Sequence, residues 1–123
     1  MNGNKFFIDT NIVLSLLNGD LKAKDFLENK ETYLSFITEL ELLSFHKIAK
    51  SELANIESFL NDCNIIGITE EIKKNVIIIR SKFKLKLPDA IILASAITLD
   101  LDFLTMDLQL KKVYSKIKKG AVK

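Results

Sequence analysis

The sequence predicts an α/β fold, a three-layer sandwich in which a largely parallel sheet of about four to five strands is flanked by helices. The first observation is that short apolar runs typical of buried strands alternate with longer stretches of helical periodicity. The second is that no segment rich in Pro, Gly or Ser interrupts this alternation. We therefore expect a single domain over residues 1–123.

The first part of the chain begins with a run of three apolar residues, which fits a buried parallel strand. Gly19 is a stop signal for the helix that follows, and Asp20 can cap the next one. The elements expected here are a strand at Lys5–Ile8, helices at Ile12–Asn18 and from Asp20 to about Asn29, a strand at Thr32–Phe36, and helices at Thr38–Lys50 and from Ser51 to about Asp62.

The second part of the chain has two clear helix starts. Thr69 offers a capping hydroxyl, and Glu70 and Glu71 suit the positive first turn of a helix. Pro88 is the only proline, at a position that a first helical turn tolerates. The elements expected here are a strand at Asn64–Ile68, helices at Thr69–Lys82 and Asp89–Leu99, a strand at Asp102–Thr105, a short helix from Asp107, and room for a last short strand at Val113–Ser115.

The composition excludes several classes of protein. Apolar residues make up 48% of the chain and charged residues 28%, which is typical of a globular protein rather than a disordered one. The net charge of +2 is too small to indicate a nucleic-acid partner by itself. A single cysteine, Cys63, excludes an internal disulfide, and a single histidine, His46, excludes a paired-histidine site. We expect Cys63 to be packed and His46 to be exposed.

The sequence has no membrane segment and no phosphate-binding loop. The apolar stretches Ile12–Leu17, Val76–Ile79 and Ala90–Ile97 are far shorter than the roughly 18 residues of a membrane-spanning helix. Asp9 and Asn11 interrupt what would be the apolar part of a signal peptide. The four glycines are too scattered to cradle a phosphate. We therefore expect a cytoplasmic protein without a membrane partner.

Two acidic residues follow predicted strands. Asp9 comes directly after the first strand, and Asp107 comes two residues after the last main strand. Because parallel strands end at the same edge of a sheet, where sites form in α/β folds, both residues are expected at that edge. Each could also serve only as a helix cap, which is the ordinary explanation for an isolated aspartate before a helix.

Helical periodicity points to Glu41 as a third acid of this group. In the expected helix Thr38–Lys50, with about 100° per residue, Glu41 falls in the middle of an apolar arc and Glu39 falls on the opposite side. The arc consists of Ile37, Leu40, Phe45, Ile48 and Ala49. We therefore expect Glu41 to point inward and Glu39 to be solvated, and a buried carboxylate needs a cation, a hydrogen-bond network or a proton.

Asp89 is the fourth acid. It heads an apolar stripe of the helix Asp89–Leu99 that consists of Ile92, Leu93, Ala96 and Ile97. Four carboxylates are then expected to converge without a histidine or a cysteine. Clustered carboxylates raise one another's pKa, and a hard divalent cation with oxygen ligands, Mg²⁺ or Mn²⁺, relieves their repulsion. Such an ion beside a phosphodiester supports hydrolysis without a protein nucleophile.

These acids lie in segments that resemble the PIN-domain family of metal-dependent ribonucleases, and among them the VapC-type toxins of bacterial toxin–antitoxin pairs. The segments that carry the resemblance are Phe6-Phe7-Ile8-Asp9-Thr10-Asn11, Leu34-Ser35-Phe36-Ile37-Thr38-Glu39-Leu40-Glu41-Leu42-Leu43, Leu87-Pro88-Asp89-Ala90-Ile91-Ile92-Leu93-Ala94-Ser95-Ala96 and Phe103-Leu104-Thr105-Met106-Asp107. Together they span Phe6 to about Leu110, in the order and at the spacing of the family.

The resemblance implies that the four acids bind the metal and carry the catalysis: Asp9, Glu41, Asp89 and Asp107. It also implies that Thr10 or Asn11, together with Thr105, orient ligands or water. The family motif has a glutamate before a leucine, which Glu39 and Glu41 both satisfy, and the helical-face argument favours Glu41. At the end of the last motif, Gln109 supplies no further carboxylate where the family often has an acid.

The implied function is that of a Mg²⁺- or Mn²⁺-dependent endoribonuclease that leaves a 5′-phosphate and a 3′-hydroxyl. The implied partners are RNA, a cognate antitoxin protein and a second copy of the chain. Six basic residues near the acids are candidates for binding the RNA backbone: Arg80, Lys82, Lys84, Lys86, Lys111 and Lys112. The plain alternative is that they are solvated charges of a connecting segment and of the C-terminal tail.

Two other functions remain open at the level of sequence. The first is a catalytically inactive PIN-like module that binds RNA or protein, although a binding module has no need of four clustered acids. The second is a receiver or phosphatase domain of similar layout. Both of those families place further acids near the first aspartate, and Asn11 makes this chain a poor match.

Overall fold

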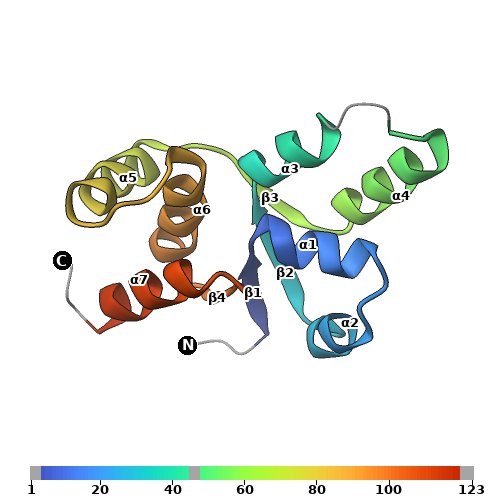
Figure 1. Cartoon of the computed structure of the whole chain (residues 1–123), viewed down its shortest axis with the longest axis horizontal. Coiled ribbons are helices and arrows are strands. Elements are labelled where there is room, and N and C mark those ends of the chain that lie inside the picture. The colour runs from blue at the N-terminus through green and yellow to red at the C-terminus, as the bar shows by residue number, and fades with distance from the viewer. Residues whose placement is uncertain (1–3, 45–47, 120–123) are drawn as a thin grey trace.

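A parallel sheet of four strands forms the middle layer of the fold (Figure 1). The structure is a computed structural model, and it describes residues 4–44 and 48–119. The strands are β1 (Lys5–Ile8), β2 (Glu31–Ser35), β3 (Asn64–Ile66) and β4 (Asp102–Leu104), and they stand in the order β3-β2-β1-β4. In the register of the sheet, Phe7 pairs with Tyr33 of β2 and with Phe103 of β4.

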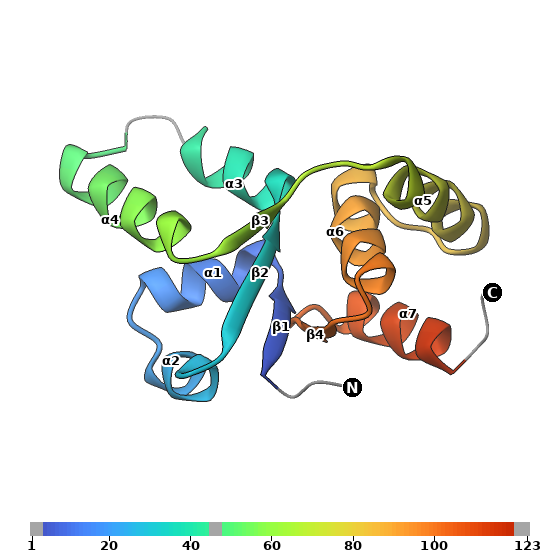
Figure 2. The same ribbon diagram turned by 180° about the vertical axis from the view of Figure 1, so that it is seen from behind.

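Helices cover both faces of the sheet, as Figures 1 and 2 show from opposite sides. One group lies on the side of α1 and the other on the side of α6, with α3 near the carboxyl end of β2. The helices are α1 (Thr10–Leu17), α2 (Leu21–Leu27), α3 (Phe36–Leu43), α4 (Lys50–Asn61), α5 (Glu70–Lys82), α6 (Leu87–Thr98) and α7 (Leu108–Lys118).

The alternation of side chains along β1 divides the core between the two faces. Phe7 packs with Ile92 and Ala96 of α6, whereas its neighbour Ile8 belongs to the cluster formed with α1, α2, α3 and α4. A further cluster joins α5, α6 and α7 on the Phe7 side. Because β1 is buried on both faces, a continuous apolar run is the sequence that this strand requires.

The predicted fold class is confirmed, and two expected elements are wrong. The helix expected over Thr38–Lys50 begins earlier, at Phe36, because Ser35 caps it by accepting a hydrogen bond from the amide of Ile37 at 3.0 Å, and it ends at Leu43. The strand allowed at Val113–Ser115 lies inside α7. The buried residues of α7 are Leu110, Val113 and Ile117, and these spacings of three and four are those of a helix.

Three smaller expectations concern single residues, Gly19, Cys63 and His46. Gly19 follows α1 with a φ of 85°, the left-handed conformation that suits glycine at a helix end. Cys63 is half-buried, and burial raises its pKa to about 11. The expectation for His46 lies outside the described residues. Among the described helices, none is long and apolar enough to cross a membrane.

Candidate functional site

Two of the acids lie where neighbouring strands end. The amide of Asp9 donates to the carbonyl of Leu104 at 3.4 Å, so the ends of β1 and β4 are in contact. Asp9 caps α1 by accepting from the amide of Ile12, and Asp107 caps α7 by accepting from the amide of Leu110, each at 3.0 Å. The plain explanation as helix caps is therefore correct for both, and it does not exclude a second role.

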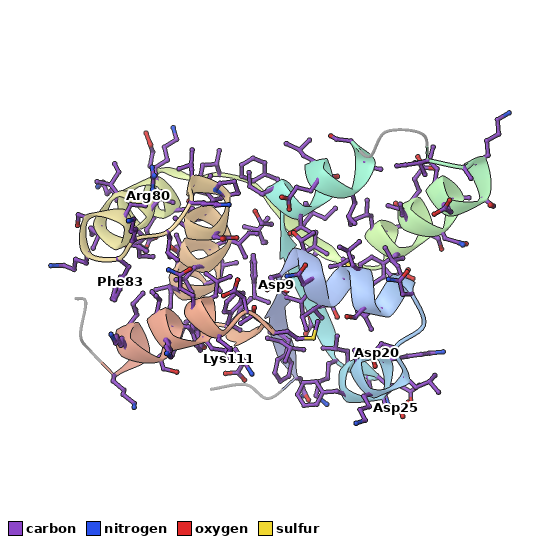
Figure 3. All side chains as sticks on the ribbon, in the orientation of Figure 1. Asp9, Asp20, Asp25, Arg80, Phe83 and Lys111 are labelled. Carbon is purple, nitrogen blue, oxygen red and sulfur yellow. The ribbon has the colours of Figure 1, made fainter. Side chains whose placement is uncertain are left out.

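The four acids line one pocket of about 170 Å³, although they come from different elements. Its lining residues are Asp9, Thr10, Asn11, Glu41, Asp89, Ile92, Asp107 and Leu110. None of these described residues carries a positive charge. Figure 3 shows Asp9 near the middle of the molecule, with Asp20 and Asp25 apart from it on the side of α2. The arrangement concentrates negative charge at the carboxyl edge of the sheet.

Asp9 is the most deeply buried of these acids, with 4% of its surface exposed. Burial raises its pKa above the usual value, and the nearby charge of Asp107 raises it further. The hydrogen bonds from Thr105 and from the amides of Ile12 and Asn11 lower the pKa in part. These donors favour the ionised form of the Asp9 carboxyl group, whereas burial alone would favour its neutral form.

Thr105 connects two of the acids through one hydroxyl group. Its Oγ1 donates to Oδ2 of Asp9 and accepts from the backbone amide of Asp107 at 3.0 Å. Thr105 is itself buried, with 2% exposure. The loop between β4 and α7 is thus tied to the carboxylate at the end of β1.

Glu41 lines the pocket but does not point into the apolar core. Its Oε1 accepts from the hydroxyl of Thr10 at 2.6 Å, and the side chain is exposed. The expectation that Glu41 is the inward acid and Glu39 the solvated one is therefore wrong, since Glu39 is half-buried. The buried residues of α3 are Thr38 and Leu42, and at about 100° per residue both glutamates flank this stripe at similar angles.

Asp89 is half-buried in the first turn of α6. Burial raises its pKa, and the charges of three other acids raise it further, in the order Asp107, Glu41 and Asp9. Lys86 lowers the pKa and is the nearby positive charge that opposes them. The other three carboxylates that line the pocket thus all lie close enough to Asp89 to disfavour its ionised form.

The donor set fits a hard divalent cation in its chemistry, because it consists of carboxylates with no balancing charge in the pocket. Among residues 4–44 and 48–119, however, no group of three or more acidic, histidine or cysteine side chains is arranged to hold a metal ion. Asp9, Glu41 and Asp107 each already accept a hydrogen bond from a donor of the protein. The carboxylates would have to close in on an ion to bind it together.

The basic candidates lie at different places. Lys86 lowers the pKa of Asp89. Lys84 contacts α7 because its backbone carbonyl accepts a hydrogen bond from the side-chain Nε2 of Gln109 at 2.8 Å. Arg80 and Lys84 line a separate groove of about 510 Å³, and Nε of Arg80 donates to the carbonyl of Leu85 at 3.2 Å. The remaining basic candidates, Lys82, Lys111 and Lys112, are exposed on α5 and α7. None of the six lines the acidic pocket.

Sequence reasoning missed Thr38. Its side chain is completely buried, and its Oγ1 lies 2.9 Å from Oγ1 of Thr10. The sequence feature that could have indicated Thr38 is a polar residue three positions before Glu41 on the same helix. The pocket-lining residues Ile92 and Leu110 were also missed, because their spacing marks them as ordinary core residues.

Comparison with known proteins identifies the family of this chain. Residues 6–116 match the PIN domain, and the chain belongs to the PIN domain family. A comparison with curated proteins finds no match.

Three solved structures resemble the chain over most of its length. One is described as a toxin–antitoxin complex from Klebsiella pneumoniae, with 35% identity, 82% of this chain and 85% of that chain covered, and a TM-score of 0.72. VapBC2 from Rickettsia felis, bound to a DNA fragment from its promoter, has 20% identity, coverage of 89% and 92%, and a TM-score of 0.79. FitAcB from Neisseria gonorrhoeae has 22% identity, coverage of 89% and 93%, and a TM-score of 0.75. The last two show the likeness of fold.

Proposed function

We propose that this protein is a Mg²⁺- or Mn²⁺-dependent endoribonuclease that hydrolyses RNA phosphodiester bonds as the toxin of a type II toxin–antitoxin pair. The observation that carries the proposal is the pocket at the carboxyl edge of the sheet, where four carboxylates from a PIN domain meet. Burial and neighbouring acids raise the pKa of Asp9 and Asp89, so their ionised forms destabilise the fold, and carboxyl groups perturbed in this way are typical of functional sites.

In the proposed reaction, Asp9, Glu41, Asp89 and Asp107 would hold the ion. A divalent ion bound there supplies positive charge, which lowers the pKa of a water molecule and offsets the charge that develops on the phosphate oxygens. The oxygen of water forms a bond to phosphorus and gives up a proton, the bond from phosphorus to the 3′-oxygen breaks, and the 3′-oxygen takes up a proton, which leaves a 5′-phosphate and a 3′-hydroxyl. Thr105 and Thr10 keep Asp9 and Glu41 in position, and Asn11 lies beside them at the pocket wall.

The RNA backbone is proposed to approach across the basic residues near the pocket. Lys86 is the best supported, since its charge already reaches Asp89. Arg80, Lys82 and Lys84 continue from it along α5 and the connection to α6, and Lys111 and Lys112 lie on α7 after Asp107. Positive charges at these positions would neutralise phosphates on either side of the bond that is cut.

A cognate antitoxin is the proposed protein partner, and the cytoplasm is the proposed place of action. The support is that a structure with 35% identity to this chain is described as a toxin–antitoxin complex. We propose that residues 1–123 act as a single PIN domain, of which residues 6–116 match the family.

A homodimer is also proposed, and α5 offers a face for it. Ile77 is 70% exposed beside a groove of about 270 Å³ whose other lining residues are Ile68, Lys73, Val76, Leu87 and Ile91. Glu70 and Glu71 lie in the first turn of α5, and Arg80 and Lys82 lie in its last turn. Two copies related by a two-fold axis would pack α5 antiparallel and bring Glu70 of one copy towards Arg80 of the other, since these two residues share the helix face of Ile77.

The test is cleavage of total bacterial RNA by the purified protein with Mg²⁺, with Mn²⁺ and with EDTA. Asp89→Asn is the inactive variant, because it keeps the size of the side chain and removes a proposed ligand. Asp25→Asn is the matched control, since Asp25 is an exposed acid of α2 that lies apart from Asp9 (Figure 3). We expect discrete fragments with 5′-phosphate ends only with metal, from the parent and Asp25→Asn.

Equal cleavage by Asp89→Asn would show that another nuclease is responsible. Metal binding without cleavage of any RNA would favour the alternative, a catalytically inactive module that binds RNA or protein. Phosphorylation of Asp9 by a small phosphodonor would instead favour a receiver-like or phosphatase-like function.

A further inference from the structure

Thr38 has a buried hydroxyl that serves no purpose in capping α3. The helix is capped by Ser35, whose hydroxyl accepts from the amide of Ile37. Thr38 lies in the first turn beyond that cap and has no exposed surface. Its Oγ1 lies 2.9 Å from Oγ1 of Thr10, which belongs to a different helix and lines the acidic pocket.

The direction of this hydrogen bond follows from the proton of Thr10. A hydroxyl group has one proton to donate, and an ionised carboxylate can only accept. The proton of Thr10 is directed to Oε1 of Glu41, at 2.6 Å. Thr38 must then be the donor in its contact with Thr10, and the three side chains form a relay from Thr38 through Thr10 to Glu41.

We propose that Thr38 is a positioning residue for the acidic site, which acts through Thr10 on the carboxylate of Glu41. The inference rests on the proposed function, in that Glu41 is taken as a ligand of the divalent ion. Thr38 does not line the pocket, and its contribution is to fix the hydroxyl of Thr10 so that the proton points at Glu41.

Glu41 depends on this relay more than the other acids do on their own neighbours. Asp9 and Asp107 are held by backbone amides at the starts of α1 and α7. Glu41 has a longer and exposed side chain, and the hydroxyl of Thr10 is the donor that the described part of the chain provides for it. Hydrogen bonds in such chains polarise and strengthen one another, so the loss of Thr38 weakens the contact between Thr10 and Glu41 as well.

The first measurement is Mn²⁺ affinity by calorimetry for four proteins: the parent, Thr38→Val, Thr38→Ser and Thr98→Val. Valine has nearly the shape of threonine without the hydroxyl, and serine keeps the hydroxyl. Thr98 is a matched control because its hydroxyl is bonded to Asn75 at 2.7 Å between α5 and α6, in another part of the core. We expect Thr38→Val to weaken Mn²⁺ binding about tenfold, the loss typical of groups that orient metal ligands. Thr38→Ser and Thr98→Val should stay within about twofold of the parent.

The same substitution in the Glu41→Ala background separates positioning from a general structural role. If Thr38 acts through Glu41, Thr38→Val should change the Mn²⁺ affinity of Glu41→Ala by less than about twofold. An equal loss in both backgrounds would overturn the proposal, as would parent-like binding by Thr38→Val or a loss in Thr38→Ser as large as that in Thr38→Val.

A second readout does not depend on the ion. In protein with ¹³C-labelled glutamate, the side-chain resonances of Glu41 should show increased motional averaging in Thr38→Val and parent-like behaviour in Thr38→Ser. If the parent failed to bind Mn²⁺, the metal part of the proposed function would fall, and this spectrum would still decide whether the relay exists. Unchanged Glu41 resonances in Thr38→Val would refute it.

Discussion

Replacing Thr105 by valine should destabilise the protein strongly, although valine fits the same volume. The hydroxyl of Thr105 donates to the buried carboxylate of Asp9 and accepts from the amide of Asp107. Valine does neither, so one substitution leaves two polar groups without their partner. Both groups belong to the same edge of the sheet, where the burial of Asp9 leaves its carboxylate little access to water.

The magnitude follows from the two contacts. A hydrogen bond to a charged group contributes about 1.5–3 kcal/mol, and an unpaired buried donor costs about 1–3 kcal/mol. The amide of Asp107 is only half-buried, so water can replace part of its lost bond. We therefore expect a loss of about 2–4 kcal/mol in the free energy of unfolding. With a typical urea dependence of about 2 kcal/mol per molar, the midpoint should fall by about 1–2 M.

The assay is urea unfolding of the parent, Thr105→Val and Thr105→Ser without metal, followed by circular dichroism at about pH 7.5. Serine keeps the hydroxyl and should lose less than about 1.5 kcal/mol, the effect of one methyl group. The Thr105 bond lowers the pKa of Asp9, so its contribution shrinks as Asp9 takes up a proton at acidic pH. Thr105→Val as stable as the parent, or Thr105→Ser as unstable as Thr105→Val, would refute this reasoning.

Three further predictions concern charge, metal and assembly. Burial and neighbouring acids raise the pKa of Asp89, so its ionised form destabilises the fold as the pH rises above the usual aspartate range. Asp89→Asn should therefore unfold at a higher temperature than the parent at about pH 7, with the gain vanishing below about pH 4, and an unchanged pH profile of melting temperature would contradict this. Mn²⁺ at about 100 times its Kd should stabilise the parent by about 2.7 kcal/mol, and thermal unfolding of Asp89→Asn with Mn²⁺ should show little of this increase. Ile77→Lys should turn the proposed dimer into a monomer in light scattering, whereas Leu21→Lys, at a similarly exposed site on α2, should not; dimeric Ile77→Lys would exclude the α5 face.

The order of the elements could be predicted from the sequence because local signals agree with the fold. Thr69 caps α5, Pro88 lies in the first turn of α6, and Gly19 ends α1. Each of these signals acts through the backbone of its own segment, so its effect does not depend on which other elements pack against that segment. The strand allowed at Val113–Ser115 failed for the opposite reason. Three residues are too few to show a period, and only the longer spacing from Leu110 to Ile117 reveals a helix.

The candidate site was predictable in its membership and not in its geometry. Asp9 and Asp107 follow strands, and the edge of a parallel sheet brings such positions together. The periodicity of α3 could not separate Glu39 from Glu41, because both flank the buried stripe of Thr38 and Leu42. What distinguishes Glu41 is the hydroxyl of Thr10, and that contact spans 31 residues of sequence.

The site combines two kinds of acid, and their difference bears on how it would bind an ion. Asp9 and Asp107 are fixed at one wall by helix amides and by Thr105, which limits the directions that their free lone pairs can take. Glu41 and Asp89 have fewer restraints, since one depends on the hydroxyl of Thr10 and the other lies half-buried in the first turn of α6. Repulsion among four carboxylates favours an open pocket, and a cation favours a closed one. Asp9 and Asp107 can then set the geometry of the site while Glu41 and Asp89 adjust to the ion. We therefore expect variants at Thr105 to impair both stability and metal affinity, and variants at Thr38 to impair chiefly metal affinity.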